Sequence, residues 1–112
     1  MDLESILAMM GTYAERKVAR FESDGLVVDT AAVPDSEHPY ETAVLHPEYN
    51  MGKWVVVEGY DTKEDAQIGH DHWVATMTTE PLPTKLVDCA NSEISQLIKS
   101  TGGQMEFPRK RE

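Results

Sequence analysis

The chain has 112 residues, of which 40% are hydrophobic and 27% are charged. This length supports one domain with a single core, and the composition excludes a wholly disordered chain. The formal net charge is −10, and without the last four residues 7 basic residues stand against 19 acidic ones, a net charge of −12. Because phosphate backbones are bound by clustered Lys and Arg, we expect no direct contact with nucleic acid.

The chain begins without a secretory signal pattern, and no apolar run approaches the roughly 20 residues of a membrane span. We therefore expect synthesis in a reducing cytoplasm and no membrane partner. The one cysteine, Cys89, cannot pair within the chain, and we expect it to be a small buried thiol.

The N-terminal stretch has the spacing of a helix. Between Leu3 and Phe21, apolar residues recur every three or four positions, which predicts an amphipathic N-terminal helix. This helix either packs on a sheet or docks onto a partner subunit, in which case Met10 and Tyr13 widen its apolar face.

Three extended segments follow the turn signal at 23–25. The segments 26–33, 40–46 and 53–59 are rich in β-branched residues and predict strands. In the third segment, alternation puts Trp54, Val56 and Glu58 on one face, with Val55 and Val57 on the other. If Trp54 and Val56 look away from the core, their face is a subunit contact.

A helix starting after Asp61 is the sharpest prediction. Thr62, with an acidic residue three positions later, forms a variant of the capping box. One stripe of the following helix is small or apolar and should face the core, with His70 as a hydrogen-bonded core residue and His72 solvated. The members of this stripe are Ala66, Gly69, His70, Trp73 and Met77.

Prolines at 81 and 83 end that helix. Lys85 to Cys89 predicts a short extra strand or a strap across the sheet. Asn91 or Ser92 can start a C-terminal helix that ends at 102–103. Residues 1–103 would form the domain, and 104–112 an extended tail.

The histidines are the main candidates for chemistry. His38 and His46 lie in or beside the predicted hairpin, and His70 and His72 lie on the helix without a chelating spacing. A metal-dependent hydrolase would need His38, His46 and His70 to converge. Since no nucleophile motif or phosphate-binding loop is present either, we expect no enzyme activity, metal or cofactor.

Three stretches together resemble a family of small tailed-bacteriophage proteins, in which a YET strand, a YDTKEEA helix cap and a GHDKWV helix recur. Here they read YET at 40–42, YDTKEDA at 60–66 and GHDHWV at 69–74. The likeness covers about residues 26 to 77. It implies a phage origin and a virion component, and brings no functional residue with it.

We therefore expect an α+β fold: an antiparallel sheet of three or four strands, one central helix, and N- and C-terminal helices. The expected function is that of a non-enzymatic structural protein of a tailed-phage virion, such as a capsid decoration or head–tail junction component, synthesised in the host cytoplasm. It would act in many copies or as a homo-oligomer, contacting other capsid or neck proteins. The alternative is a soluble acidic phage-encoded inhibitor that binds a basic host protein. The candidate partner-binding residues are Met10, Tyr13, Trp54, Val56, Phe107, Arg109, Lys110 and Arg111, the last three as a solvated tail or an arm on an acidic neighbour.

Overall fold

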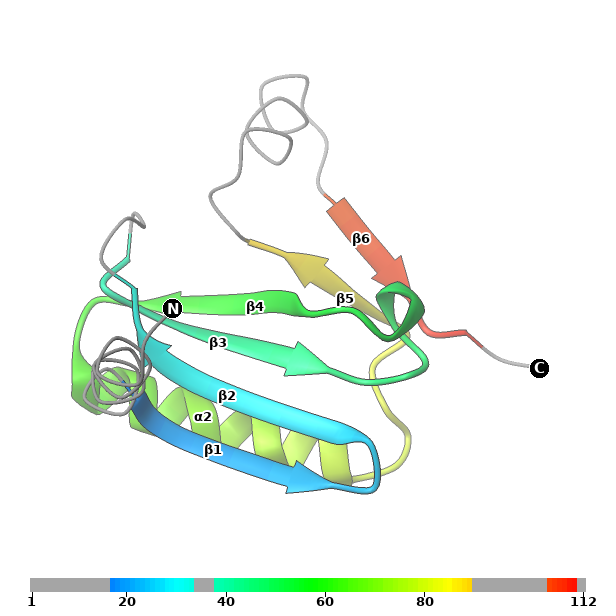
Figure 1. The fold of residues 1–112 in the computed structure, drawn as a ribbon, viewed down its shortest axis with the longest axis horizontal. Helices are drawn as coiled ribbons and strands as arrows, with labels where there is room; N and C mark the ends of the chain where they lie inside the picture. The colour runs from blue at the N-terminus through cyan, green and yellow to red at the C-terminus, as the bar shows by residue number, and fades with distance from the viewer. Residues whose placement is uncertain (1–16, 34–37, 90–104, 111–112) are drawn as a thin grey trace, which may run out of the picture.

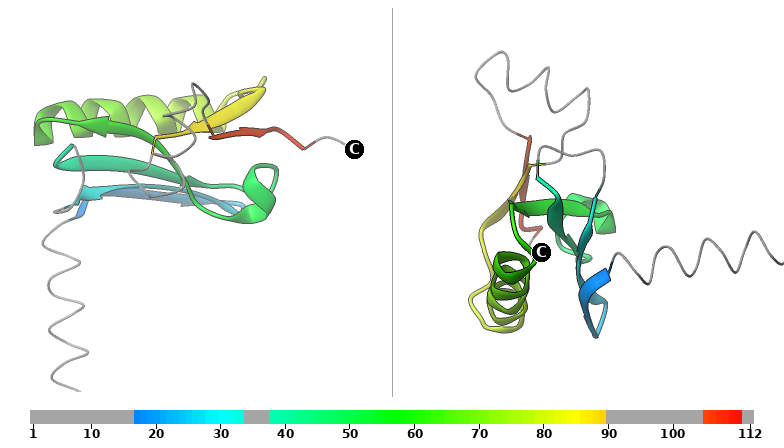
Figure 2. Two further views of the ribbon diagram at one scale, coloured as in Figure 1. Left: turned by 90° about the horizontal axis from the view of Figure 1, so that it is seen from above. Right: turned by 90° about the vertical axis from the view of Figure 1, so that its left-hand side faces the viewer.

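A computed structural model of the chain describes residues 17–33, 38–89 and 105–110. Within these residues the fold is α+β, with a four-stranded antiparallel sheet, one helix along one of its faces and a smaller two-stranded sheet (Figures 1 and 2). The prediction of an α+β fold with three or four antiparallel strands is confirmed. The elements are β1 (Lys17–Ser23), β2 (Leu26–Ala32), β3 (Tyr40–Leu45), the 3-10 turn η1 (Asn50–Gly52), β4 (Val55–Tyr60), α2 (Lys63–Thr78), β5 (Lys85–Asp88) and β6 (Met105–Pro108).

The first strand corrects the prediction of a helix up to Phe21. Asp24 and Gly25 have φ values of 48° and 86°, and Ser23 pairs with Leu26 across this two-residue connection. Positive φ at both central residues suits a tight hairpin, so β1 is fixed by its turn and by pairing with β2 rather than by its own periodicity. The remainder of the predicted N-terminal helix, with Met10 and Tyr13, and the predicted C-terminal helix lie outside the described residues.

A bulge in β4 corrects the predicted alternation of side chains. Thr42 pairs with Glu58, whereas the next residue, Ala43, pairs with Val56, so Val57 is the extra residue. After the bulge, Glu58 lies on the face that meets α2, instead of sharing the face of Val56. Val56 looks away from α2, as one of the two predicted arrangements required.

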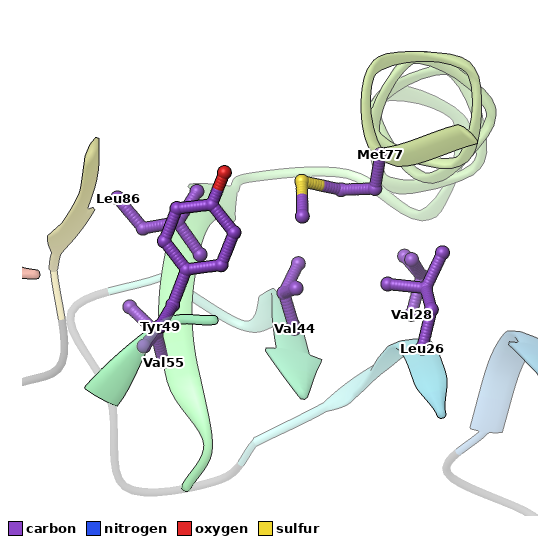
Figure 3. Close-up of a cluster of buried hydrophobic side chains, with 7 residues drawn as sticks. All are labelled: Leu26, Val28, Val44, Tyr49, Val55, Met77 and Leu86. Atoms are coloured by element: carbon purple, nitrogen blue, oxygen red, sulfur yellow. The ribbon is translucent and has the colours of Figure 1, made fainter. Parts of the chain in front are cut away.

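The helix α2 starts where the sequence predicts. The Thr62 side chain accepts a hydrogen bond from the Asp65 backbone N–H at 3.1 Å, which satisfies one of the exposed donors of the first turn. The predicted stripe faces the sheet: Ala66, Gly69, His70 and Met77 are buried and Trp73 packs at the border of the core. The apolar core beneath the second half of α2 consists of Leu26, Val28, Val44, Tyr49, Val55, Met77 and Leu86 (Figure 3).

The second sheet is formed by β5 and β6, which extend the fold beyond β4. The Cys89 backbone N–H donates to the Val56 carbonyl at 2.8 Å, which joins the two sheets. Residues 104–112 were predicted as an extended tail separate from the domain, but β6 pairs with β5 and Phe107 packs against the core. The segment 85–89 is therefore a strand, the first of the two predicted alternatives.

Candidate functional site

A chain of hydrogen bonds crosses the interface between the sheet and the first half of α2. His70 Nδ1 lies 2.9 Å from Thr30 Oγ1, which lies 2.6 Å from Thr42 Oγ1. Thr42 Oγ1 is 3.1 Å from the Tyr60 hydroxyl, which donates to Glu58 Oε1 at 3.2 Å. Since the Glu58 carboxylate can only accept, and each hydroxyl has one proton, the donors run in one direction from His70 to Glu58. His70 therefore carries a proton on Nδ1.

Burial favours the neutral forms of two members of this chain, His70 and Tyr60. Burial lowers the pKa of His70 from its ordinary value of 6.5, and burial raises the pKa of Tyr60 to about 12. Neither group is poised to exchange a proton near neutral pH. The arrangement is that of a structural network, which confirms the prediction of His70 as a hydrogen-bonded core residue.

A hollow of about 470 Å³ opens where β4 passes into α2. Its floor is close-packed, because a Cβ atom at Gly69 would overlap the Tyr60 ring. Ile68, at its rim, is 65% exposed. Oδ1 of the exposed Asp61 lies 3.0 Å from His38 Nδ1. We call this surface the α2-start hollow; it is lined by His38, Glu58, Gly59, Tyr60, Asp61, Asp65, Ile68, Gly69 and His72.

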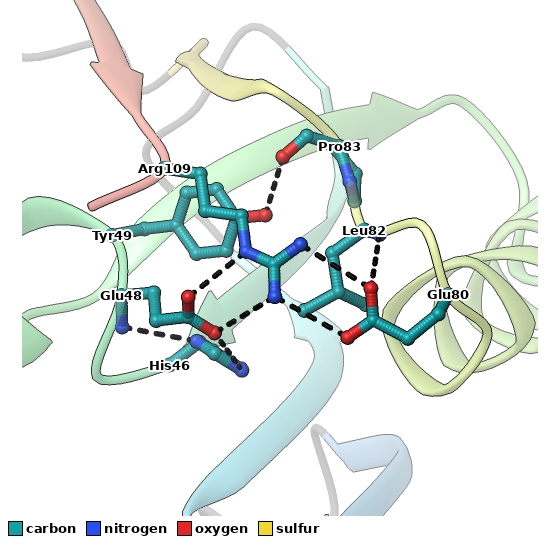
Figure 4. Close-up of polar contacts among 7 residues, drawn as sticks. All are labelled: His46, Glu48, Tyr49, Glu80, Leu82, Pro83 and Arg109. Atoms are coloured by element: carbon teal, nitrogen blue, oxygen red, sulfur yellow. Dashed lines mark hydrogen bonds and ion pairs between the residues drawn. The ribbon is translucent and has the colours of Figure 1, made fainter. Parts of the chain in front are cut away.

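Arg109 fastens the end of β6 to the rest of the fold (Figure 4). Its guanidinium contacts both oxygens of Glu48, with Nε 2.9 Å from Oε1, and reaches Glu80 at 3.3 Å. The Arg109 side chain is only 11% exposed. Arg109 was predicted to lie in a solvated tail or in an arm on an acidic neighbour. The structure corrects this, because both of its acceptors, Glu48 and Glu80, belong to the same chain.

The charges of this cluster support each other. The hydrogen bonds that Arg109 donates lower the pKa of Glu48, and donating to the Glu48 and Glu80 carboxylates raises the pKa of Arg109. Burial lowers the pKa of the neighbouring His46, whose Nδ1 accepts from the Glu48 backbone N–H at 3.0 Å. The cluster fastens the end of β6 to residues before and after α2 of the same chain.

The turn before β4 carries the most exposed large apolar side chain among the described residues. Asn50, Met51 and Gly52 have φ values of 49°, 53° and 76°, and Met51 is 85% exposed. The left-handed backbone conformation of Met51 is unfavourable for a residue other than glycine, and the exposed side chain buries no apolar area in return. The turn is therefore a candidate for a functional surface. We call this surface the η1 end; it comprises Met51, Lys53, Trp54, Phe107 and Lys110.

The η1 end contains three of the predicted partner-binding residues. Trp54 is 45% exposed, while Phe107 and Lys110 line a hollow of about 520 Å³ together with Met51. Val56 lies half-buried on the sheet face away from α2, and Arg111 lies outside the described residues. Met51 and Ile68 were not predicted; the available signals were the turn residues flanking Met51 and the place of Ile68 off the core stripe.

His38, His46 and His70, which a metal-dependent hydrolase would have to bring together, do not converge. His38 is next to Asp61, His46 is next to Glu48, and His70 is next to Thr30. Residues 17–33, 38–89 and 105–110 contain no group of three His, Cys, Asp or Glu side chains placed to hold a metal ion. Cys89 is half-buried, which corrects the expectation of a buried thiol. Over the same ranges, no helix is both long and apolar enough to cross a bilayer.

Comparisons with models of known protein families, with curated proteins and with solved structures give no match to this chain.

Proposed function

We propose that this protein is a non-enzymatic structural component of a tailed-phage virion that acts through protein–protein contacts. The observation that carries the proposal is the exposure of large apolar side chains, with Met51 and Trp54 at one end of β4 and Ile68 at the other. Exposed apolar patches rimmed by polar residues mark contact surfaces in many proteins. The virion itself is suggested by the sequence resemblance described above.

The contacts of two polar side chains, His70 and Arg109, also support a structural role. His70 ends a buried hydrogen-bond chain, and Arg109 joins β6 to two carboxylates of the same domain. The hydrogen bonds described for both side chains are made within the fold. What the surface offers to other molecules is shape, apolar area and charge.

The test is the composition of purified particles. Particles of the encoding phage are banded by density, washed in high salt and analysed by quantitative mass spectrometry against the major capsid protein. We expect this protein in a fixed copy number per particle. Its absence from the particles, while it is abundant in the infected cell, contradicts the virion role.

The second candidate is the soluble inhibitor, and the carboxylates at the start of α2 favour it. Asp61, Glu64 and Asp65 are exposed within one turn of each other. An inhibitor that binds a basic host protein through them would be held mainly by charge, so its complex should weaken steeply between low and high salt. A contact that depends on Met51 and persists in salt favours the structural role instead.

A further inference from the structure

The η1 end and the α2-start hollow lie at opposite ends of the same strand. η1 precedes β4 and α2 follows it, so the six residues of β4 separate the two surfaces by about 20 Å (Figure 1). Each surface has one prominent exposed aliphatic side chain, Met51 at 85% and Ile68 at 65%. The two surfaces therefore lie at opposite ends of β4.

Their charges are opposite. Lys110 lines the hollow beside Met51, and the exposed Lys53 follows Met51 by two residues; within the described part of the chain neither ammonium group has an ion pair. Asp61 and Asp65 border the α2-start hollow beside Ile68. On a chain with a net charge of −10, these two cations and Met51, the most exposed large apolar side chain of the described residues, form a distinct local surface. The surface that complements it is present on every other copy of the same chain.

We infer that this protein associates head to tail with itself, the η1 end of one copy docking into the α2-start hollow of the next. Met51 enters the hollow and contacts Ile68, and Lys53 and Lys110 face Asp61 and Asp65. Methionine suits this role because its flexible, polarisable side chain fills irregular apolar surfaces. The inference deepens the proposed function, on which it rests, by naming a second copy of this chain as one partner.

The contact is heterologous, since two different surfaces meet. Such contacts leave one unused surface of each kind at the two ends of an open assembly. Further copies can therefore add, until the assembly either closes into a ring or continues as an open filament. A symmetric dimer, in which the same surface meets itself, has no unused partner surface. This difference provides a sharp test.

The test uses Met51→Glu and Ile68→Glu, one substitution at each surface. In analytical ultracentrifugation over a concentration series, the wild-type protein should exceed its monomer mass of 12.5 kDa increasingly with concentration. Each variant alone should remain a monomer, because a carboxylate replaces one side of the apolar contact. Mixed in equal amounts, the two variants should form a dimer and nothing larger: the intact surfaces join, and the two Glu-bearing surfaces repel each other.

Ala75→Glu is the matched control. Ala75 is exposed and lies seven residues after Ile68, about 10 Å along the same face of α2 and outside the hollow. This variant should assemble like the wild type, and circular dichroism with thermal unfolding should show all three variants folded.

Every other outcome overturns the inference. A wild type that stays monomeric at all concentrations has no self-contact, whatever the particle analysis shows. An assembly that survives either single substitution uses other surfaces, and a mixture that stays monomeric shows that Met51 and Ile68 do not meet. Presence of the protein in the particles together with any of these results keeps the virion role and removes self-docking.

Discussion

The interface between α2 and the main sheet has two halves that differ in chemistry. Beneath the end of α2, Val28 and Val44 meet Met77 in an apolar core. Beneath its start, Thr30 and Thr42, the next inward residues on the same two strands, meet His70 through hydrogen bonds. Valine and threonine have nearly the same shape, so the two halves differ in polarity far more than in volume.

The comparison shows how one small interface divides its tasks. The apolar half gains stability from the area it removes from water, and this gain tolerates small shifts of the helix. The hydrogen-bonded half gains little net energy but is costly to leave unsatisfied, so it penalises any other position of α2. We infer that the threonines and His70 fix the placement of the helix, and with it the shape of the α2-start hollow.

The largest expected effect is in the apolar half. Leu86→Ala removes a side chain that is 2% exposed and leaves a cavity between β5 and the core. We expect a loss of about 2–5 kcal/mol in the free energy of unfolding, measured by urea denaturation. A loss well below this range would mean that the second sheet repacks and contributes little to the domain.

The next effect comes from exchanging the chemistry of the two halves on β2. Thr30→Val leaves the His70 Nδ1–H without its acceptor, and Val28→Thr buries a hydroxyl among aliphatic groups. We expect each nearly isosteric change to cost about 1–3 kcal/mol in urea denaturation. If either substitution is neutral, the division into two halves does not hold at that position.

A smaller net effect is expected at the floor of the α2-start hollow. Gly69→Ala would gain about 1 kcal/mol in helix propensity, but the added Cβ meets the Tyr60 ring. Overpacking of this kind costs about 1–3 kcal/mol, so we expect a net loss of stability in thermal unfolding. Gln67→Ala, on the exposed face of the same helix, should change stability by less than about 0.5 kcal/mol. A stabilised Gly69→Ala protein would show that Tyr60 can move aside.

The smallest effect concerns pH. Because the folded state lowers the pKa of His70, the unfolded chain binds this proton first as the pH falls, and stability should decline as the pH falls below about 6.5. His46 has a lowered pKa as well and adds to the decline. His70→Gln should flatten the dependence of unfolding free energy on pH between 7 and 5, and His72→Gln, at an exposed position of the same helix, is the matched control. An unchanged slope in His70→Gln would assign the whole effect to other groups.

Local signals were sufficient for the middle of the fold. The cap at Thr62, the stripe through His70 and the strands 26–33 and 40–46 follow from neighbouring residues, and the structure confirms them. The strand β1 could not be found from periodicity, since its spacing also suits a helix and its partner strand decides between them. Only the pair Asp24-Gly25 pointed to the hairpin.

The candidate surfaces were predicted less well, because they depend on distant contacts. The partners of Arg109 lie 61 and 29 residues away, so no local pattern reveals that this residue is bound inside the domain. The exposure of Met51 follows from the path of the turn, and the hollow beside Ile68 from the packing of Tyr60 against Gly69. Trp54, Phe107 and Lys110, which were predicted to be partner-binding residues, lie at the η1 end, and that role stays a prediction. Met51, at the centre of the same surface, was not predicted.

The extra residue at Val57 has a consequence for how this sequence can vary in length. The bulge divides β4 into two parts with opposite alternation of side chains. Before it, Val55 faces α2, and after it, Glu58 and Tyr60 do. Deleting or inserting one residue between them would turn Glu58 and Tyr60 outward. The network of His70, Thr30 and Thr42 would then lose its terminal acceptor. Related sequences that keep this network should therefore vary in residue type along β4 but not in the number of its residues.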